Sequence, residues 1–348
     1  MELQNRRNFL KKAGIIATTG FLPLPSFAND LLKEDEDVFV KKPMARKNPD
    51  LLVNSYYYAP HNHSLLTQHL DYDLAKMVSI GTDIVTFCVQ EDQLDNWNQQ
   101  RIRNVVDRAH EHGLKVHVVP NRWTGLTAGW LDGYSSWSIR NTDTWLPGTE
   151  NQKNAFSDPN NPKVEEWYKK NLERLFNEFN FDGLVWDEPR PFNNVDVFYF
   201  LDKMTAYIKT LKPDAPVSIF AESTCLHLKD TFPKLKHIDY LGSDGHVRSE
   251  DHKMKRMKTT IFEAHKAFYE PLKKAGKKTF FLLEAHRHRD ADLENYLQNM
   301  DKAFNLPMDH LMYYYSAHEM SIKNEKIFNE ATWKTVAALK GISYKSGN

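Results

Sequence analysis

The chain has 348 residues, of which 41% are hydrophobic and 26% are charged, and its 46 basic side chains balance 46 acidic ones. This composition is that of a folded protein and excludes extended disorder, and the lack of a basic excess argues against nucleic acid as a partner. The length fits either two ordinary domains or one large α/β barrel.

Residues 1–28 have the features of an export signal. Arg6 and Arg7 precede a mildly apolar stretch from Ala13 to Leu24, and Ser26-Phe27-Ala28 then offers small residues for cleavage. The segment resembles a twin-arginine signal, which implies a periplasmic or secreted protein. A basic amphipathic first helix is the alternative. No later apolar run is long enough to span a bilayer, so no membrane span is expected.

Residues 29–50 are rich in charge, so we expect a solvated lead-in before one domain over residues 51–345. In that domain short β-branched and aromatic runs alternate with helical patterns, which is typical of parallel βα units. The strand-like runs extend from Leu51 to Tyr58, Asp83 to Val89, Lys115 to Pro120, Phe181 to Trp186, Pro216 to Ala221, Ile238 to Gly242, Lys278 to Leu283 and His310 to Tyr315. The helical patterns extend from Leu70 to Ser79, Trp97 to His112, Pro162 to Asn180, Val195 to Leu211, His252 to Ala275, Leu293 to Phe304 and Asn329 to Leu339.

Eight such strands predict a (β/α)8 TIM barrel. A doubly wound open sheet is the alternative. That fold needs a glycine-rich phosphate turn after its first strand, where this chain has Tyr57-Tyr58-Ala59-Pro60-His61. Only two cysteines are present, Cys88 and Cys225, so no disulfide framework is implied.

The long connection from Arg122 to Asn161 is predicted to lack regular structure. It contains the aromatic residues Trp123, Trp130, Tyr134, Trp137 and Trp145. Long loops at the C-terminal face of a barrel are usually functional, and aromatic rings can stack on the apolar faces of sugar rings. A hydrophobic cluster under the loop is the alternative for any one of them, and the set as a whole favours a ligand.

Polar residues follow most of the strand-like runs, at the end of the barrel where active sites lie. They include Tyr58, His61, His63, Arg122, Asp187, Glu188, Arg190, Glu222, Asp244, His246, Glu284, His286, Arg287, His288 and His318. Charges are costly to bury unless they are paired or used, so this ring of acids, histidines and arginines predicts an active site. For any single residue, a salt bridge at the rim is the alternative.

The segment Trp186-Asp187-Glu188-Pro189 resembles the Asn-Glu-Pro that ends strand four in the large clan of retaining barrel glycoside hydrolases. That clan carries its nucleophile at the end of strand seven, where this chain has Glu284. The resemblance implies that Glu188 is the acid/base and Glu284 the nucleophile, with the two carboxylates about 5 to 5.5 Å apart. Asp187 stands where the clan has Asn, and a second acid there changes the local pKa values.

Asp187 also supports a second resemblance. Glycosidases of the α-galactosidase and α-glucosidase kind use an Asp at the end of strand four as nucleophile, after a lead such as Asp182-Gly183-Leu184, and their acid/base ends strand six, where this chain has Asp244. Chitinase-like barrels share the Asp-Gly lead, but their acid would fall at Pro189, so that family is disfavoured.

The histidines at the predicted rim suit a third chemistry, elimination on a uronate, which needs a base, an acid and a cation that holds the carboxylate. Tyr58, Arg190 and Arg287 or Arg289 accompany these histidines. His61-Asn62-His63 and His286-Arg287-His288 are weak signals for a metal, and Arg287 between two histidines suits an anion better.

We therefore expect an exported enzyme that hydrolyses polysaccharide-derived oligosaccharides, without a cofactor or metal. The predicted catalytic residues are Glu188, Glu284, Asp187 and Asp244. The predicted substrate-binding residues are Tyr58, His61, His63, Arg122, Trp123, Arg190, Glu222, His246, His286, Arg287, His288 and His318. A lyase or oligosaccharide dehydratase is the alternative, and a non-catalytic sugar-binding barrel is the third possibility.

Overall fold

The computed structural model describes residues 48–58, 67–95, 98–127, 135–149, 156–189, 196–221, 230–246, 269–284, 308–316 and 323–345. For Tyr58, residues 244–246, Glu284, Ser316 and residues 323–328 it describes the backbone alone. All of these residues belong to one unit, Met44–Asn348, and the other unit is Met1–Pro43. The predicted export signal lies outside the described residues.

Eight parallel strands close into a barrel in chain order, which confirms the predicted (β/α)8 fold. β1 pairs with β2 on one side and with β8 on the other, so the sheet has no free edge. The strands are β1 (Leu52–Tyr58), β2 (Ile84–Gln90), β3 (Lys115–Asn121), β4 (Gly183–Asp187), β5 (Val217–Ala221), β6 (Tyr240–His246), β7 (Lys278–Glu284) and β8 (His310–Ser316). Each of the eight predicted runs contains or overlaps one of them.

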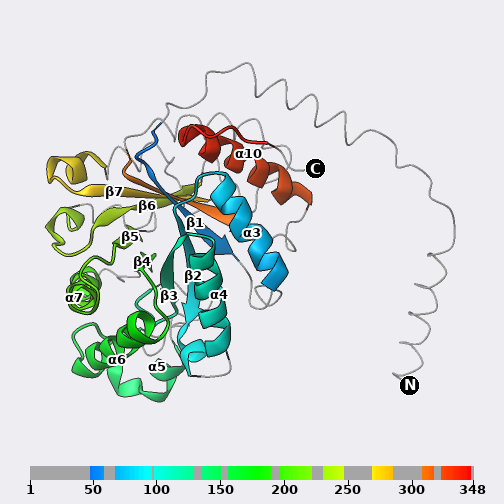
Figure 1. The fold of residues 1–348 in the computed structure, drawn as a ribbon. Coiled ribbons are helices and arrows are strands. Elements are labelled where there is room, and N and C mark those ends of the chain that lie inside the picture. The colour runs from blue at the N-terminus through cyan, green and yellow to red at the C-terminus, as the bar shows by residue number, and fades with distance from the viewer. Residues whose placement is uncertain are drawn as a thin grey trace, which may run out of the picture. The chain divides into compact units, whose positions relative to one another are not determined.

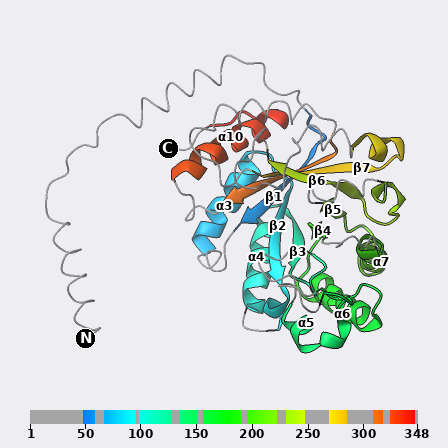
Figure 2. The same cartoon turned by 180° about the vertical axis from the view of Figure 1, so that it is seen from behind.

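The helices lie outside the ring of strands, and the view from behind shows the same arrangement (Figures 1 and 2). The longer ones are α3 (Thr67–Ser79), α4 (Gln99–Glu111), α6 (Pro162–Glu173), α7 (Asp196–Leu211) and α10 (Lys323–Leu339). The short ones are η3 (Glu91–Leu94), α5 (Ser136–Arg140), η4 (Thr142–Thr144), η5 (Arg174–Glu178) and η7 (Phe232–Lys234). The connection predicted to lack regular structure therefore contains α5 and η4.

Alternate residues of the strands fill the inside of the barrel, because successive side chains of a strand point to opposite faces. The inner cluster consists of Tyr56, Val119, Val185, Phe220, Phe280, Leu282 and Met312, with Tyr240 and Tyr314 packed against it. Val185 lies inside and Asp187 is two residues further along β4, so Asp187 faces the mouth of the barrel at the C-terminal ends of the strands.

Polar side chains lie below this cluster, toward the N-terminal end of the barrel. The Thr86 hydroxyl donates to Asn54 Oδ1 at 2.8 Å, and Ser218 Oγ lies 3.4 Å from Nδ1 of His310. His117 and His310 are fully buried here. A Cβ atom on Gly183 would lie 2.6 Å from Nε2 of His117, so glycine at this position makes room for the imidazole ring.

Four aspartates, each just before an even-numbered strand, form matching contacts at the N-terminal end of the barrel. Each carboxylate accepts the backbone N–H of the first or second residue of the preceding odd-numbered strand and binds a lysine. We call these contacts the aspartate clamps. They are Asp83 with Val53 and Lys340, Asp182 with Val116 and Lys212, Asp239 with Val217 and Lys209, and Asp309 with Thr279 and Lys273.

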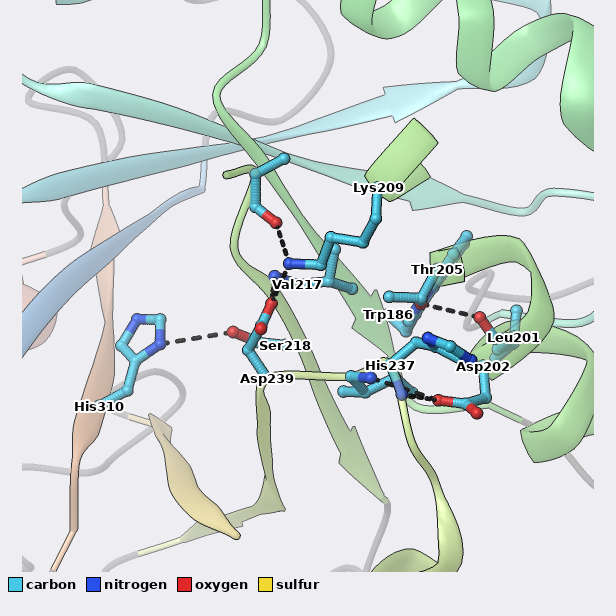
Figure 3. A network of polar contacts seen from close by, with 12 residues as sticks. Trp186, Leu201, Asp202, Thr205, Lys209, Val217, Ser218, His237, Asp239 and His310 are labelled. Carbon is cyan, nitrogen blue, oxygen red and sulfur yellow. Dashed lines mark hydrogen bonds and ion pairs between the residues drawn. The ribbon is translucent and has the colours of Figure 1, made fainter. Parts of the chain in front are cut away.

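One clamp is drawn in Figure 3, where Asp239 lies between the ammonium group of Lys209, 2.6 Å away, and the backbone of Val217, 2.7 Å away. In the same view Asp202 of α7 accepts the backbone N–H of His237 at 2.8 Å. Asp202 also accepts the N–H groups of Lys236 and Ile238, so it fixes the segment that leads into β6.

Candidate active site

The mouth of the barrel contains a hydrogen-bonded group of three side chains from three strands. The hydroxyl of Tyr56, on β1, donates to Oδ2 of Asp187, the last residue of β4, at 3.2 Å. The same hydroxyl lies 2.6 Å from Sγ of Cys88, on β2. The ring of Tyr56 contacts the ring of Tyr314, with centroids 4.9 Å apart. This arrangement holds a carboxylate in place at the C-terminal end of the strands, where barrel enzymes carry their catalytic groups.

Both neighbours of Asp187 stay neutral. Burial, followed by the charge of Asp187, raises the pKa of the Cys88 thiol to about 12, although the Tyr56 hydroxyl offsets part of this rise. Cys88 is exposed, and it lies two residues beyond Thr86, which faces the inside of the barrel, so its side chain points toward the mouth. Burial, Cys88 and Asp187 together raise the pKa of Tyr56 well above its ordinary value. Asp187 therefore has two neutral groups with protons beside it.

Glu188 follows directly on Asp187 in an unusual backbone conformation. Its φ is 38°, in the left-handed region that side chains other than glycine rarely adopt. Arg122 and Thr124, just beyond β3, have φ values of 62° and 49°. Such positions cost about 1 to 3 kcal/mol each and gather at functional sites. The ends of the neighbouring strands β3 and β4 thus share this strain, and both Glu188 and Arg122 are half-buried.

The other two predicted catalytic residues are placed by their backbone. Glu284 is the last residue of β7 and pairs in register with His246 of β6. Asp244, two residues before His246, pairs with Leu282 of the inner cluster. Tyr58 ends β1 opposite Ser316. Tyr58 and Glu284 are thus the last residues of their strands, and Asp244 lies two residues before the end of β6. His61, His63, Arg190, Glu222, His286, Arg287, His288 and His318 lie outside the described residues.

Trp123, which was predicted to bind substrate, is fully buried. Its ring contacts those of Trp167 and Tyr168, with centroids 5.3 and 5.7 Å away, and the Tyr168 hydroxyl donates to the Trp123 carbonyl. In this structure Trp123 is a packing residue, as the hydrophobic-cluster alternative predicted. Trp137 is half-buried and its ring lies 5.4 Å from that of Trp167.

Glu91, the residue directly after β2, fixes the start of α5. Its carboxylate accepts the hydroxyl of Ser136 and the backbone N–H of Trp137, the latter at 3.1 Å. The side chain is buried, and both hydrogen bonds join the short helix to the strand end. We call the connection from Arg122 to Asn161, with its tryptophans, the aromatic connection. Its position depends on the carboxylate of Glu91, which could have been taken for a catalytic group.

Tyr56 and Cys88 were not among the predicted site residues. Both belong to runs that are apolar on both faces, as in other parallel sheets, so the sequence does not show which side chains point inward. The signal that could have found them is spacing: Tyr56 lies two residues before Tyr58 and therefore on the same face of the strand.

Among the residues that the structure describes, no group of three or more His, Cys, Asp or Glu side chains is placed to hold a metal ion. In the same part of the chain, no helix is both long and apolar enough to cross a membrane.

No protein-family model and no curated protein sequence matches the chain. Many solved structures resemble it. An α-amylase from Geobacillus thermoleovorans, complexed with acarbose, has a TM-score of 0.55 and 11% identity over 85% of this chain and 80% of its own. An endo-β-1,4-mannanase from Thermotoga petrophila has a TM-score of 0.56 and 11% identity, over 86% of this chain and 78% of its own. A Pseudomonas stutzeri endoglucanase in complex with cellobiose has a TM-score of 0.54 and 14% identity, over 85% of this chain and 95% of its own. At these identities the similarity shows the barrel fold.

Proposed function

We propose that the protein is a carbohydrate-active enzyme that hydrolyses a glycosidic bond in polysaccharide-derived oligosaccharides, with Glu188 as the acid/base. The observation that carries this proposal is the pair of consecutive carboxylic acids at the end of β4. Asp187 is held in the barrel mouth by Tyr56, and Glu188 follows it in a left-handed conformation. Glycoside hydrolysis needs one carboxylic acid that gives a proton and a second that acts as an anion.

The solved structures support the substrate class. The three named above are an amylase, a mannanase and an endoglucanase, and two of them were determined with acarbose or cellobiose. Each acts on a glycan, and each shares the barrel. Fold alone does not set function, so this support applies to the class of substrate and not to a particular sugar or linkage.

The second carboxylate of the proposed reaction is Glu284. It ends β7, three strands round the barrel from β4, and its backbone lies at the mouth. A retaining mechanism would use it as nucleophile, and the pair Asp187 and Asp244 would serve the rival arrangement of nucleophile and acid. The histidines and arginines of the predicted rim would then bind substrate.

The decisive experiment compares products by mass and by ultraviolet absorbance after incubation with neutral and with uronate-containing oligosaccharides. Chain scission with addition of water supports the proposal. Loss of water from an intact chain would mean a dehydratase, and scission with the absorbance of a conjugated uronate would mean a lyase. Either result, or no turnover of any glycan, would overturn hydrolysis.

Glu188→Gln tests the proposed proton donor, because the amide keeps the shape of the side chain and cannot give a proton. We expect a loss of activity of about a hundredfold or more. The matched control is Glu270→Gln, an exposed glutamate before β7 and remote from the end of β4, which we expect to leave activity unchanged. Full activity in Glu188→Gln would show that another residue is the acid.

A further inference from the structure

Three polar side chains point into the N-terminal half of the barrel. Asn54, His117 and His310 each lie two residues before a member of the inner cluster, so they face the same way, and all three are fully buried. Within the described part of the chain, no hydrogen bond reaches Nδ2 of Asn54, either ring nitrogen of His117, or Nε2 of His310. Nearly all buried polar atoms of native proteins bind a protein group or ordered water. These four nitrogens therefore indicate a bound ligand.

The four nitrogens belong to one connected layer across the barrel. The Thr86 hydroxyl donates to Oδ1 of Asn54 at 2.8 Å, and Thr86 pairs in register with His117. The ring centroids of His117 and His310 lie 6.5 Å apart. On the far side Nδ1 of His310 lies 3.4 Å from Ser218 Oγ, as Figure 3 shows. At this ring separation no nitrogen of one imidazole reaches the other by a direct hydrogen bond, so a third group has to bind them.

The chemistry of the layer defines this third group. Burial lowers the pKa of His117 to about 3 and that of His310 well below 6.5, so both rings are neutral. A neutral imidazole has one N–H donor and one acceptor nitrogen, so its ligand has to accept a hydrogen bond and also donate one. A metal ion does only the first kind of work of a ligand pair, since it binds acceptor nitrogens alone, and no group of three or more His, Cys, Asp or Glu side chains among the described residues is placed to hold one.

We propose that the N-terminal half of the barrel binds at least two ordered water molecules, which join His117 to Asn54 and His310. The two ring nitrogens of His117 point in different directions, so one water molecule does not satisfy both. Gly183 keeps space open beside Nε2, because a Cβ atom there would lie 2.6 Å from this nitrogen and 2.5 Å from the Pro216 carbonyl oxygen. A buried water molecule typically makes about three hydrogen bonds, so two of them serve all four nitrogens.

The inner cluster separates this water site from the mouth of the barrel. Val185 and Phe220 of that cluster each follow two residues after a member of the polar layer, Gly183 and Ser218, and both are buried. A substrate at the mouth therefore has an apolar layer between itself and the water molecules. The water site is thus independent of the proposed hydrolysis, and its test needs no substrate.

The first test counts long-lived internal water molecules in solution by oxygen-17 magnetic relaxation dispersion. His117→Leu removes both ring nitrogens and leaves an apolar side chain of comparable size. We expect at least two fewer long-lived water molecules in this variant than in the wild type. The matched control is His237→Leu, because His237 is exposed, and it should keep the wild-type number. An unchanged number in His117→Leu would overturn the proposal.

The second test uses the wild type alone, so it decides the question even if His117→Leu does not fold. In protein labelled with nitrogen-15 at histidine, NMR identifies the protonated nitrogen of each neutral ring and measures magnetisation transfer from its proton to water. We expect the N–H proton of His117 to show a cross-peak with a long-lived water molecule. A His117 N–H without this cross-peak, or ring nitrogen shifts typical of metal coordination, would contradict the water site.

Discussion

The rings of His117 and His310 lie 6.5 Å apart between centroids and nearly perpendicular, at 84°, inside the N-terminal half of the barrel. Both side chains are fully buried. Burial lowers the pKa of His117 from 6.5 to about 3. It also lowers the pKa of His310 well below 6.5, with a further contribution from His117. Both imidazoles are therefore neutral in the folded protein at neutral pH.

We expect these two histidines to make the protein sensitive to mild acid. Between pH 6.5 and the lower folded-state pKa, the unfolded chain binds protons that the folded chain does not, so stability falls as the pH falls. Above pH 6.5 neither state is charged and the penalty is absent. For His117 the loss is about 2 kcal/mol between pH 6.5 and 5. His117→Asn and His310→Asn should each lose less stability over this interval in guanidinium unfolding.

The control is His237→Asn, because the side chain of His237 is exposed. This variant should lose stability between pH 6.5 and 5 as the wild type does. If the His117 and His310 variants also follow the wild type, other groups are responsible for the acid sensitivity.

Removal of an aspartate clamp should destabilise the barrel. Asp309 accepts the N–H of Thr279 at 2.7 Å and its hydroxyl at 3.0 Å, and binds Lys273 at 2.7 Å. Asp309→Ala removes all three contacts, so we expect a loss of about 2 to 3 kcal/mol in the free energy of unfolding at pH 7. Asp143→Ala, which breaks the exposed ion pair with Lys163, should change stability much less.

This clamp also has a defined pH dependence. Burial alone would raise the pKa of Asp309, but Lys273 and Thr279 outweigh it and hold the pKa below 3.8. The stability that the charged carboxylate contributes is therefore present above about pH 4 and disappears as the pH falls through the folded-state pKa. The difference between the wild type and Asp309→Ala should shrink below pH 4. A difference that stays constant there would show that the charge of Asp309 does not matter.

Glu91→Ala should loosen α5 with little effect on the rest of the barrel. The hydrogen bonds that Glu91 accepts from Ser136 and Trp137 link the end of β2 to the start of this helix. We expect amide hydrogen exchange in residues 136–140 to become about tenfold faster or more, because bonds to a charged acceptor are worth about 1.5 to 3 kcal/mol. Asp92→Ala, at the exposed neighbouring position, should leave exchange there unchanged.

Trp123 and Trp137 should separate stability from binding. Trp123→Ala empties a fully buried site and should cost about 3 to 5 kcal/mol of unfolding free energy. Trp137→Ala changes a half-buried ring and should cost less stability, while it weakens oligosaccharide binding if the aromatic connection contacts substrate. Guanidinium unfolding and KM measure the two effects. A Trp123→Ala protein with normal stability and weak binding would restore Trp123 as a substrate-binding residue.

The sequence predicted the fold well because each strand of a parallel barrel is a short apolar run between helical patterns, and all eight runs correspond to strands. It predicted the ends of β4 and β7 as sites for acids, since Asp187 and Glu284 end their strands. It could not distinguish Tyr56 from Tyr57, because both faces of the strand are buried and only the closed barrel decides which faces inward. Nor could it show that Asp182-Gly183, which resembles a glycosidase lead, serves packing: Asp182 clamps Val116, and Gly183 makes room for His117.

The aspartate clamps all lie at the opposite end of the barrel from Asp187 and Glu188. Each clamp ties an odd-numbered strand to the start of the next strand, so it opposes a slip of one residue, which would turn every inward side chain outward. The register of four strand pairs is thus anchored at the N-terminal end of the barrel. We therefore expect changes in the length and sequence of the loops at the opposite end to leave the acids that the strands carry at the same positions along the barrel axis. A barrel built in this way can be given a new substrate pocket by exchange of its loops alone.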